Sequence, residues 1–251
     1  MTIDWTTTEV RVVEEIDSTN AEARRVAEAG ASGPLWIVAR RQSAGRGRLD
    51  RTWQTPNGNL AATLLIPVSG WPPDRASDMG FAATLSVVDL LRTPLFRLEP
   101  VIKWPNDVLV SGKKLSGILL ESFVTGRGIS TVAVGIGLNI ASCPDPAEVR
   151  WPASCLAVET GTCPEVLEVF ERLAPCLQNR VDQIACGERQ ALMADWRDHL
   201  KGVGEAIEVH TGKQVLCGTF SGVDDMGHLC LATVEGERKI SAAEIFFAGQ
   251  S

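Results

Sequence analysis

The hydrophobic and polar positions of this chain alternate between strand-like and helix-like stretches. Short apolar runs, bounded by glycine, proline or turn-forming polar residues, predict strands at residues 9–16, 35–41, 59–67, 101–104, 107–110, 115–124 and 130–140. Apolar residues at helical spacing predict helices at residues 17–29, 74–92, 164–185 and 188–199. Turns are expected at residues 111–113 and 126–128, each between two predicted strands. Strands interspersed with helices indicate an α+β fold.

The pattern changes after residue 200. Residues 205–247 form a series of short strand-like stretches broken by glycines, which is typical of a small β-barrel. We therefore predict two domains, a main domain at residues 1–200 and a small β-barrel domain at residues 201–251.

Composition and charge narrow the class of protein. The 251-residue chain is 45% hydrophobic and 22% charged, as expected of a folded globular protein. Its formal net charge is −7, whereas general nucleic-acid binders are usually basic, so any anion-binding site must be local. Residues 1–16 lack the apolar core of a signal peptide, and no apolar run reaches the roughly 18 residues of a membrane-spanning helix. These features predict a cytoplasmic protein with no membrane or nucleic-acid partner.

The seven cysteines and three histidines do not form a metal-binding pattern. No CxxC pair occurs, the number of cysteines is odd, and the histidines are scattered through the last quarter of the chain. We therefore expect reduced thiols and no metal ligands among the site residues.

The most distinctive segment is the long polar loop after the second predicted strand. Between positions 40 and 51 it carries five arginines and one acidic residue, Asp50, in an otherwise acidic chain. Guanidinium groups bind carboxylates and phosphates, and the glycines at positions 45 and 47 let backbone N–H groups approach a ligand closely. The loop is predicted to bind an anion, with a solvated basic loop as the alternative. It is not a P-loop, because GxxxxGK[ST] occurs nowhere in the chain.

Two short motifs lie at the ends of later strands. Lys103, Asn106 and Asp107 belong to the segment KWPND, in which a proline restricts the backbone. Lys114 and Gly117 belong to KKLSGILLE, where a glycine within a strand indicates a close approach to the backbone. For both motifs, exposed turns with solvated lysines are the structural alternative.

Two further motifs have a structural explanation as well as a functional one. The glycines of GIGLN, which ends at Asn139, are equally explained by packing in a buried strand. In DSTN, Thr19 and Glu22 match a helix capping box. A helix N-terminus with hydroxyl groups also binds carboxylate or ureido groups, so capping and ligand binding are compatible.

Taken in order, DSTN, QSAGRGR followed by Trp53, KWPND, KKLSGILLE and GIGLN resemble the biotin–protein ligase family. Each motif alone is weak, but five in the same order over about 120 residues are highly specific. The resemblance extends from about Glu9 to Leu200, and more faintly over the C-terminal module. It implies a mixed-sheet catalytic domain of the biotin/lipoate ligase type, followed by a small SH3-like β-barrel.

Ligases of this family act in two steps. The biotin carboxylate attacks the α-phosphate of ATP to give biotinyl-5′-AMP and pyrophosphate, with Mg²⁺ as a helper ion. A lysine of a carrier domain then attacks this mixed anhydride and forms an amide, releasing AMP. The resemblance thus implies biotin, ATP and Mg²⁺ as ligands. It implies as partner the biotin carboxyl carrier protein domain of acetyl-CoA carboxylase or of a related carboxylase.

The resemblance also implies roles for individual residues. The biotin-binding residues would be Ser18, Thr19, Asn20, Gln42, Gly45, Arg46, Lys114 and Gly117. The ATP- and adenylate-binding residues would be Arg48, Arg51, Trp53, Lys103, Asn106 and Asn139. Among the catalytic residues, Lys114 would neutralise charge on the phosphoryl oxygens, and Arg48 would belong to a loop that closes over the adenylate. Asp107 would orient or deprotonate the incoming lysine.

Two features predict a ligase that is not a transcriptional repressor. Sixteen residues precede DSTN, too few for the winged helix-turn-helix of the bifunctional biotin repressors. Residues 201–251 contain seven acidic residues against four Lys and Arg, which also argues against DNA binding. The expected oligomeric state is a monomer or a homodimer.

Two other functions are consistent with parts of the sequence. A lipoate– or octanoate–protein ligase would use the same adenylation chemistry on a related fold. Such enzymes typically carry an RRxxGGGxVxxD-like segment, and this chain has no triple glycine. A non-enzymatic anion-binding or repressor module would need neither Lys114 nor ATP. Biotin-dependent pyrophosphate release separates the three.

Overall fold

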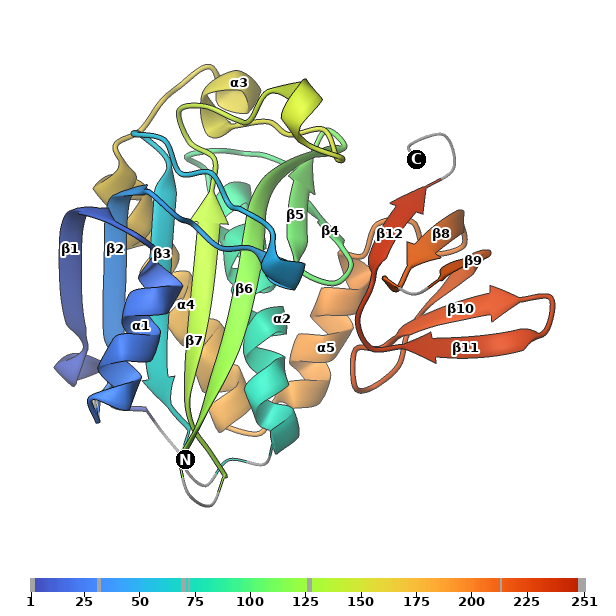
Figure 1. Ribbon diagram of the computed structural model, residues 1–251, viewed down its shortest axis with the longest axis horizontal. Helices are drawn as coiled ribbons and strands as arrows, with labels where there is room; N and C mark the ends of the chain where they lie inside the picture. The colour runs from blue at the N-terminus through green and yellow to red at the C-terminus, as the bar shows by residue number, and fades with distance from the viewer. Residues whose placement is uncertain are drawn as a thin grey trace.

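The computed structural model describes residues 3–30, 33–68, 71, 73–125, 128–212 and 214–247. Its larger part is built on a seven-stranded mixed sheet in the order β1-β2-β3-β7-β6-β5-β4 (Figure 1). The first two strands are parallel, and the other neighbouring pairs are antiparallel. The strands are β1 (Glu9–Ile16), β2 (Leu35–Gln42), β3 (Leu60–Pro67), β4 (Val101–Lys103), β5 (Asp107–Val110), β6 (Lys113–Thr125) and β7 (Gly128–Leu138).

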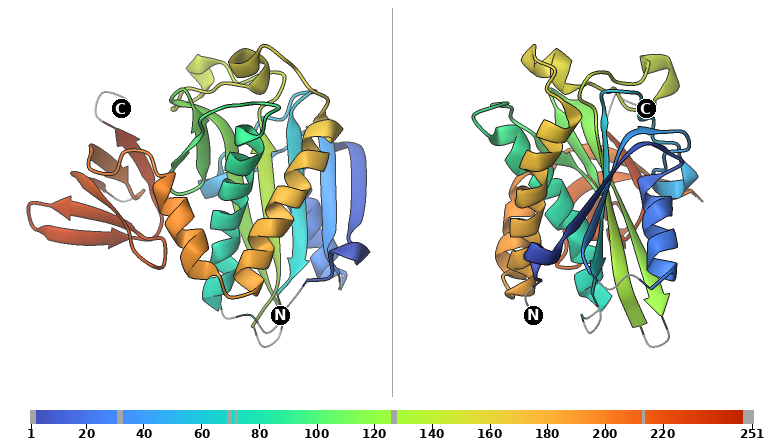
Figure 2. Two further views of the ribbon diagram at one scale, coloured as in Figure 1. Left: turned by 180° about the vertical axis from the view of Figure 1, so that it is seen from behind. Right: turned by 90° about the vertical axis from the view of Figure 1, so that its left-hand side faces the viewer.

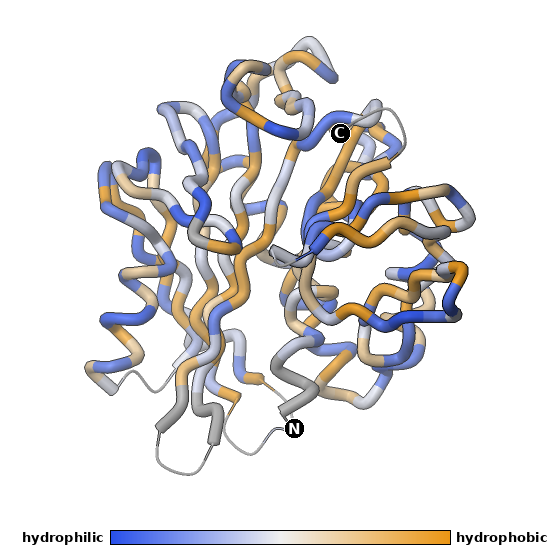
Figure 3. Tube along the Cα trace, turned by 45° about the vertical axis from the view of Figure 1, so that its right-hand side comes forward, coloured by the Kyte–Doolittle hydropathy of each residue, from blue (hydrophilic) through white to orange (hydrophobic). Residues whose placement is uncertain are grey.

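Helices cover both faces of this sheet (Figure 2). Helix α1 (Thr19–Glu28) packs on one face, against β2, β3, β6 and β7. On the other face α2 (Pro73–Arg92) and α4 (Val166–Ala185) lie side by side, and α5 (Arg189–Asp198) contacts both. Burial of both faces explains why residues 35–39 of β2, and all of β3 except Thr63, are apolar. Orange, hydrophobic stretches run along strands of the sheet in Figure 3.

The main hydrophobic core lies between the sheet and helices α2 and α4. Trp36 of β2 packs edge-on against Phe170 of α4, with ring centroids 5.2 Å apart. The same apolar cluster continues into the C-terminal module, where Phe220 is fully buried. The two modules therefore share buried apolar contacts.

The predicted strands and helices of this part are present, with ends shifted by a few residues. The short helix α3 (Leu156–Thr160), at the top of Figure 1, was missed because five residues carry too little periodicity. The hairpin turn before β6 consists of Ser111 and Gly112, both with positive φ, and Lys113 already belongs to the strand. The turn predicted at residues 126–128 lies largely outside the described residues.

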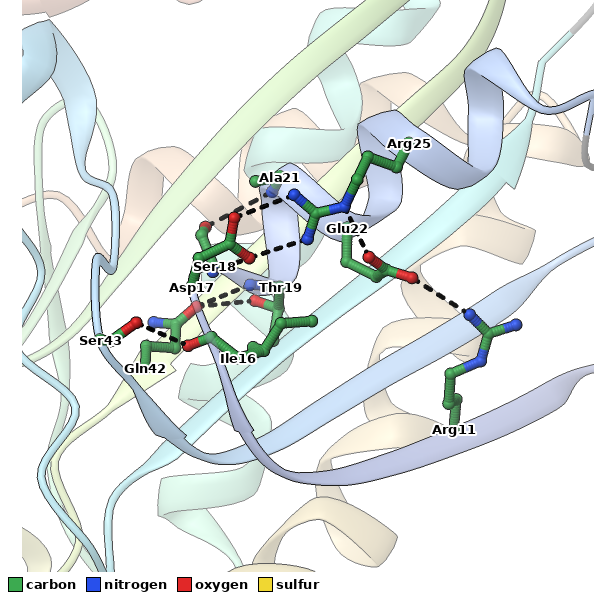
Figure 4. A network of polar contacts seen from close by, with 10 residues as sticks. All are labelled: Arg11, Ile16, Asp17, Ser18, Thr19, Ala21, Glu22, Arg25, Gln42 and Ser43. Atoms are coloured by element: carbon green, nitrogen blue, oxygen red, sulfur yellow. Dashed lines mark hydrogen bonds and ion pairs between the residues drawn. The ribbon is translucent and has the colours of Figure 1, made fainter.

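Helix α1 is capped differently from the prediction. Ser18 is the N-cap residue, and its hydroxyl accepts a hydrogen bond from the backbone N–H three residues further on. The capping box predicted for Thr19 and Glu22 is therefore wrong. The hydroxyl of Thr19 donates to Gln42 instead, and the carboxylate of Glu22 pairs with Arg25 along the helix surface (Figure 4).

The C-terminal module is a five-stranded antiparallel sheet beside the β4 edge of the main sheet (Figure 1). Its strands are β8 (Ala206–His210), β9 (Val215–Val223), β10 (Leu229–Thr233), β11 (Gly236–Ile240) and β12 (Glu244–Phe247). The strand order is β11-β10-β9-β8-β12, so β11 and β12 are the edges of the sheet among the described residues. The all-β character is as predicted, whereas closure into an SH3-like barrel stays a prediction.

The 3₁₀ turns found in the described residues are η1 (Trp5–Thr7), η2 (Arg48–Asp50) and η3 (Pro146–Glu148). No helix in the described part of the chain is both long and apolar enough to cross a membrane. The seven cysteines are free thiols.

Candidate active site

The arginine-rich loop after β2 crosses the front of the sheet, and its tip reaches the C-terminal module (Figure 1). It folds back on itself through a β-bridge between Arg46 and Thr52. Gly45 permits this hairpin, because a Cβ there would lie 2.2 Å from the carbonyl oxygen of Trp53. At the tip, Leu49 is 64% exposed and has a φ of 54°, a strained conformation for a residue with a side chain.

Three arginines of the loop hold it to different elements. Their side-chain partners are Glu121 of β6 for Arg46 (3.1 Å), Asn106 for Arg48 (3.2 Å), and Glu244 of β12 for Arg51 (2.6 Å). Burial lowers the pKa of the Arg48 guanidinium, and the nearby carboxylate of Asp107 opposes this effect. The loop is thus fixed at three points that span both modules.

Hydroxyl and amide groups line the buried side of the N-terminus of α1, whereas the charged Asp17 and Arg25 pair on its exposed side (Figure 4). The side-chain oxygen of Gln42 accepts hydrogen bonds from the backbone N–H of Thr19 at 2.8 Å and from its hydroxyl at 3.2 Å (Figure 4). The amide nitrogen of Gln42 donates to the hydroxyl of Thr55 at 3.0 Å. These contacts fix the orientation of the Gln42 amide, which the sequence could not define.

A second chain of contacts continues from Thr19 to the loop. Thr63 of β3 is fully buried, and its hydroxyl lies 2.8 Å from both the Thr19 hydroxyl and the side-chain oxygen of Asn20. The amide nitrogen of Asn20 donates to Glu121 at 2.9 Å, and Glu121 also binds Arg46. A continuous polar network therefore joins the end of α1 to the arginine loop.

Opposite charges meet at the start of β5 and β6. The ammonium of Lys114 lies 2.6 Å from the carboxylate of Asp107 and 5.3 Å from the centroid of the Trp53 ring. Asn106 is held by its amide nitrogen, which donates to the carbonyl of Ile118 at 2.7 Å. The KWPND and KKLSGILLE motifs, separate in the sequence, thus form one charged cluster.

Lys103 lies beside this cluster in an aromatic environment. Its ammonium is 4.6 Å from the ring centroid of Trp151 and 5.9 Å from that of Phe246, and the residue is 4% exposed. Burial lowers the pKa of Lys103, while the carboxylates of Asp107 and Glu244 favour its charged form. A desolvated cation of this kind interacts strongly with an anion that enters the site.

The strand glycines of this region accommodate Trp53. A Cβ at Gly137 would lie 2.2 Å from the Trp53 indole, and a Cβ at Gly117 would lie 3.0 Å from it and 3.2 Å from Lys114. The indole N–H is buried and has no hydrogen-bond partner among the described residues. The sequence predicts a ligand beside Gly117, whereas the structure places the Trp53 ring and the Lys114 side chain there.

The predicted site residues line two adjoining cavities, except for Gly45, which packs against Trp53 and Gln42. The first cavity, about 130 Å³, contains Ser18, Thr19, Asn20, Gln42, Arg46, Arg48, Asn106 and Gly117. The second, about 550 Å³, contains Asn139, whose amide donates to the carbonyl of Ser154 at 3.0 Å. The residues common to both are Arg51, Thr52, Trp53, Lys103, Asp107, Lys114 and Glu244.

Three polar residues of the site were not assigned from the sequence. Thr63 is the one polar residue in the apolar strand β3, a signal that could have identified it. Glu121 ends the KKLSGILLE motif but was given no role. Glu244 pairs with Arg51 across 193 positions of sequence, and no local pattern reveals such a contact. Burial opposes ionisation of Glu244, yet the hydrogen bond from Arg51 holds its pKa below the usual value.

Comparisons with known proteins identify the family of the chain. Residues 12–139 match the biotin/lipoate A/B protein ligase family, and residues 202–248 match the biotin protein ligase C-terminal domain. A biotin–[acetyl-CoA-carboxylase] ligase of Paracoccus denitrificans is 41% identical over 93% of this chain and 98% of its own length. A protein of the same name from Mycobacterium tuberculosis is 32% identical over 93% of this chain and 87% of its own length.

Two further comparisons concern chain length and fold. A bifunctional ligase/repressor of Bacillus subtilis is 30% identical over 92% of this chain, which spans 71% of that relative. The biotin protein ligase of Aquifex aeolicus, solved in complex with biotin and ATP, superimposes with a TM-score of 0.81 at 25% identity. That superposition covers 96% of this chain and 99% of the other. The chain therefore belongs to the biotin/lipoate protein ligase family and, within it, to the biotin protein ligases.

Proposed function

We propose that the chain activates biotin with ATP and transfers it, by way of biotinyl-5′-AMP, to a lysine of a biotin carrier domain. The observation that carries the proposal is the wall common to both cavities, where Lys103, Asp107 and Lys114 meet. The end of the first cavity at the N-terminus of α1 offers neutral hydrogen-bonding groups that suit a ureido ring. The second has a volume within the usual range for ligand pockets and cationic walls that suit a triphosphate. A carboxylate and an α-phosphate would meet at the common wall.

The biotin ring would lie at the N-terminus of α1. Ser18, Thr19, Asn20 and Gln42 supply hydroxyl and amide groups there, and the network beneath them fixes their orientation. Because these side chains are already oriented, they need not reorient when a neutral ring binds. Gly45 would contribute by allowing the loop hairpin that covers this position.

The carboxylate-bearing chain of biotin would extend along Gly117 towards Arg46 and Lys114. The first cavity, at about 130 Å³, is smaller than typical ligand pockets, because the Trp53 ring lies over the strand glycines. Binding therefore requires the loop to move and to close again over the ligand. The strained backbone at Leu49 supports such an exchange of loop conformations.

Lys114 would be the main catalytic cation. Its ammonium lies in the common wall, where negative charge develops on the phosphoryl oxygens as the carboxylate attacks. Asp107 accepts from Lys114 at 2.6 Å, which supports an orienting role for this carboxylate over a role as general base. Arg48 would close over the mixed anhydride and exclude water from it.

ATP would occupy the second cavity. Lys103 and Arg51 would bind phosphate oxygens, Asn106 would support them, and Asn139 would lie near the nucleoside. Trp53, which lines both cavities, would pack against the adenylate once the loop has closed. Arg51, Trp53, Lys103 and Asn139 are assigned because they line the second cavity, whereas Asn106 lines the first and is assigned by its place in the KWPND motif.

Mg²⁺ would enter with the triphosphate. Among the described residues no group of three or more His, Cys, Asp and Glu side chains converges on one point. Magnesium in nucleotide sites is commonly bound by one or two carboxylates together with phosphates and water. Asp107 and Glu244 are the carboxylates of the common wall, and each is paired with a cation, Asp107 with Lys114 and Glu244 with Arg51. Either would have to exchange that partner for the ion, which would offset charge on the phosphates.

The domain boundary is also proposed to lie between residues 200 and 201. The backbone of β4 at Ile102 hydrogen-bonds to His199 and Lys201, so the chain passes from one module to the other along β4. The two family matches end at residue 139 and resume at residue 202, which supports this division. A monomer and a homodimer are both compatible with the exposed edge of β1.

Mass spectrometry of the acceptor tests the proposed function. The protein is mixed with ATP, Mg²⁺, biotin and an unmodified carrier domain of acetyl-CoA carboxylase, and the carrier is then weighed. The expected result is the addition of one biotinyl group to a single lysine, with no addition when ATP is omitted. Modification by lipoate or octanoate in place of biotin would overturn the proposal. An unmodified carrier without pyrophosphate release would favour a binding module.

A further inference from the structure

One turn of the C-terminal module reaches into the catalytic domain. Residues 224–228, between β9 and β10, form what is called here the docking turn. The side chain of Asp224 accepts hydrogen bonds from the backbone N–H groups of Met226 and His228, both at 2.9 Å. Although burial opposes ionisation, the bonds from His228, Lys239 and Met226 hold the pKa of Asp224 at about 2. These contacts hold the docking turn in one conformation.

The catalytic domain holds the docking turn from two sides. Arg189 of α5 donates to the carbonyl of Asp225 at 2.6 Å, and Arg197 pairs with the carboxylate of Asp225 at 2.8 Å. Gly227 has a φ of +78°, and a Cβ there would lie 2.2 Å from the ring of Phe81 in α2. The backbone at Gly227 thus approaches α2 more closely than any other residue type would allow.

The carbonyl of Gly227 links the docking turn to the KWPND motif. It accepts a hydrogen bond from the indole N–H of Trp104 at 2.9 Å, and Trp104 is 1% exposed. Trp104 follows Lys103 directly and precedes Asn106 and Asp107 by two and three positions. A buried indole N–H without a partner is costly, so this bond restricts where the motif can lie.

The chain between the two modules restricts the same motif from its other end. The backbone N–H of Ile102 donates to the carbonyl of His199 at 2.7 Å, and the N–H of Lys201 donates to the carbonyl of Ile102 at 2.9 Å. The segment that carries Lys103, Asn106 and Asp107 is therefore held on both sides of Lys103 by contacts outside its own hairpin.

We propose that the docking turn positions the KWPND motif for the ATP-dependent step, with Trp104 as the positioning residue and Gly227 as its support. The inference rests on the proposed roles of Lys103, Asn106 and Asp107 at the ATP side of the site. The C-terminal module then acts on the reaction through Trp104 as well as through Glu244. The ring-binding groups at Thr19 and Gln42 belong to other elements, so biotin affinity is independent of the docking turn.

Gly227→Ala tests this inference, with Gly212→Ala as a matched control. Gly212, in the β8–β9 connection, has a φ of +80°, and a Cβ there meets open space. Both variants carry the same backbone strain, but only Gly227→Ala forces the docking turn away from Phe81. We expect Gly227→Ala to lower kcat/KM for ATP in biotin-dependent pyrophosphate release by roughly tenfold. The Kd for biotin should stay within about twofold of the original value, and Gly212→Ala should match the unmodified protein.

Two further variants separate positioning from loss of fold. Phe81→Leu combined with Gly227→Ala makes room for the added methyl group and should restore most of the lost kcat/KM. Trp104→Phe removes the N–H together with part of the buried ring, so its thermal unfolding is measured beside the reaction. A loss of about five- to tenfold in kcat/KM for ATP is expected while the fold is retained. Equal losses in Gly227→Ala and Gly212→Ala, or a parallel loss of biotin affinity, would overturn the inference.

Hydrogen–deuterium exchange gives a readout that does not depend on the reaction. In Gly227→Ala, residues 101–108 should exchange faster than in the unmodified protein and in Gly212→Ala. Unchanged exchange in this segment would overturn the inference even if the protein proves to be a biotin ligase. Absence of pyrophosphate release from the unmodified protein would instead refute the proposed function while leaving the exchange result to decide the positioning role.

Discussion

The two ends of the site are built in different ways. At the N-terminus of α1 the groups that line the cavity are neutral hydroxyls and amides, nearly all buried, and all lie within the catalytic domain. Thr19, Gln42 and Thr63 form the centre of this end, and Asn20 links them to the carboxylate of Glu121. At the common wall the groups are charged and come from both modules, as the contacts of Lys114, Lys103 and Glu244 show. A neutral ring needs fixed hydrogen-bonding directions, whereas a polyphosphate needs concentrated positive charge. The difference in construction therefore matches a difference in ligand.

The largest effect on activity is expected at Lys114, in the charged end of the site. Lys114→Ala should lower biotin-dependent pyrophosphate release by about 10²–10³-fold, because a cation aimed at developing charge is lost. The neutral end should be intact, so biotin should still bind. Lys113→Ala, one position earlier and exposed, is the matched control and should leave the rate unchanged. Near-normal release from Lys114→Ala would remove this lysine from the chemistry.

Arg48 is expected to give the next largest effect. Arg48→Ala removes the loop's bond to Asn106, and a charge-assisted bond contributes about 1.5–3 kcal/mol. Biotinyl-AMP should therefore leave the protein roughly 10–100-fold faster, as measured by filter retention of labelled adenylate. Arg41→Ala, which affects an exposed pair with Glu15, should retain the adenylate normally. Equal retention by both variants would contradict closure of the loop by Arg48.

The next prediction concerns Thr63, at the neutral end of the site. Thr63→Val leaves Thr19 and Asn20 without the hydroxyl beneath them, and biotin should bind about tenfold more weakly by calorimetry. The KM for ATP should hardly change, since the wall is not touched. Thr63→Ser keeps the hydroxyl and should restore affinity. A Thr63→Val variant that changed only the KM for ATP would reverse the proposed division of the site.

The smallest effect is expected at Asp224, where the change is in the free energy of unfolding. Its folded pKa of about 2 is below the ordinary value of 3.8, so its charge stabilises the fold above about pH 4, and this stabilisation is lost as the pH falls towards 2. Asp224→Asn keeps an acceptor oxygen but not the charge. The free energy of unfolding at pH 7 should fall by about 1–2 kcal/mol, with a smaller difference at pH 2. A constant difference across this range would show that the charge is not responsible.

The sequence predicts the neutral end better than the charged one. Ser18, Thr19 and Gln42 flank β1 and β2, whose patterns are regular, and parallel pairing of those strands brings their ends together. The capping box failed because Gln42 takes the Thr19 hydroxyl and arginines attract Glu22, contacts that local propensity does not include.

The charged end depends on contacts that no local pattern encodes. Lys103 and Lys114 were identified by their motifs, but their environment comes from Trp151 and Phe246 on distant segments. Gly117 was expected to permit the close approach of a ligand, yet the group that approaches both Gly117 and Gly137 is Trp53 of the same chain. Side-chain packing across the sheet decides this, and it follows from the fold as a whole.

One measurement tests the separation of the two ends most directly. It is the coupling free energy between Thr63→Val and Trp104→Phe, from kcat/KM for biotin-dependent pyrophosphate release by the two single variants and the double variant. Independent ends predict that the two losses add to within about 0.5 kcal/mol. A coupling above roughly 1 kcal/mol would contradict the account, because it would show that ring binding and the ATP side are one connected unit.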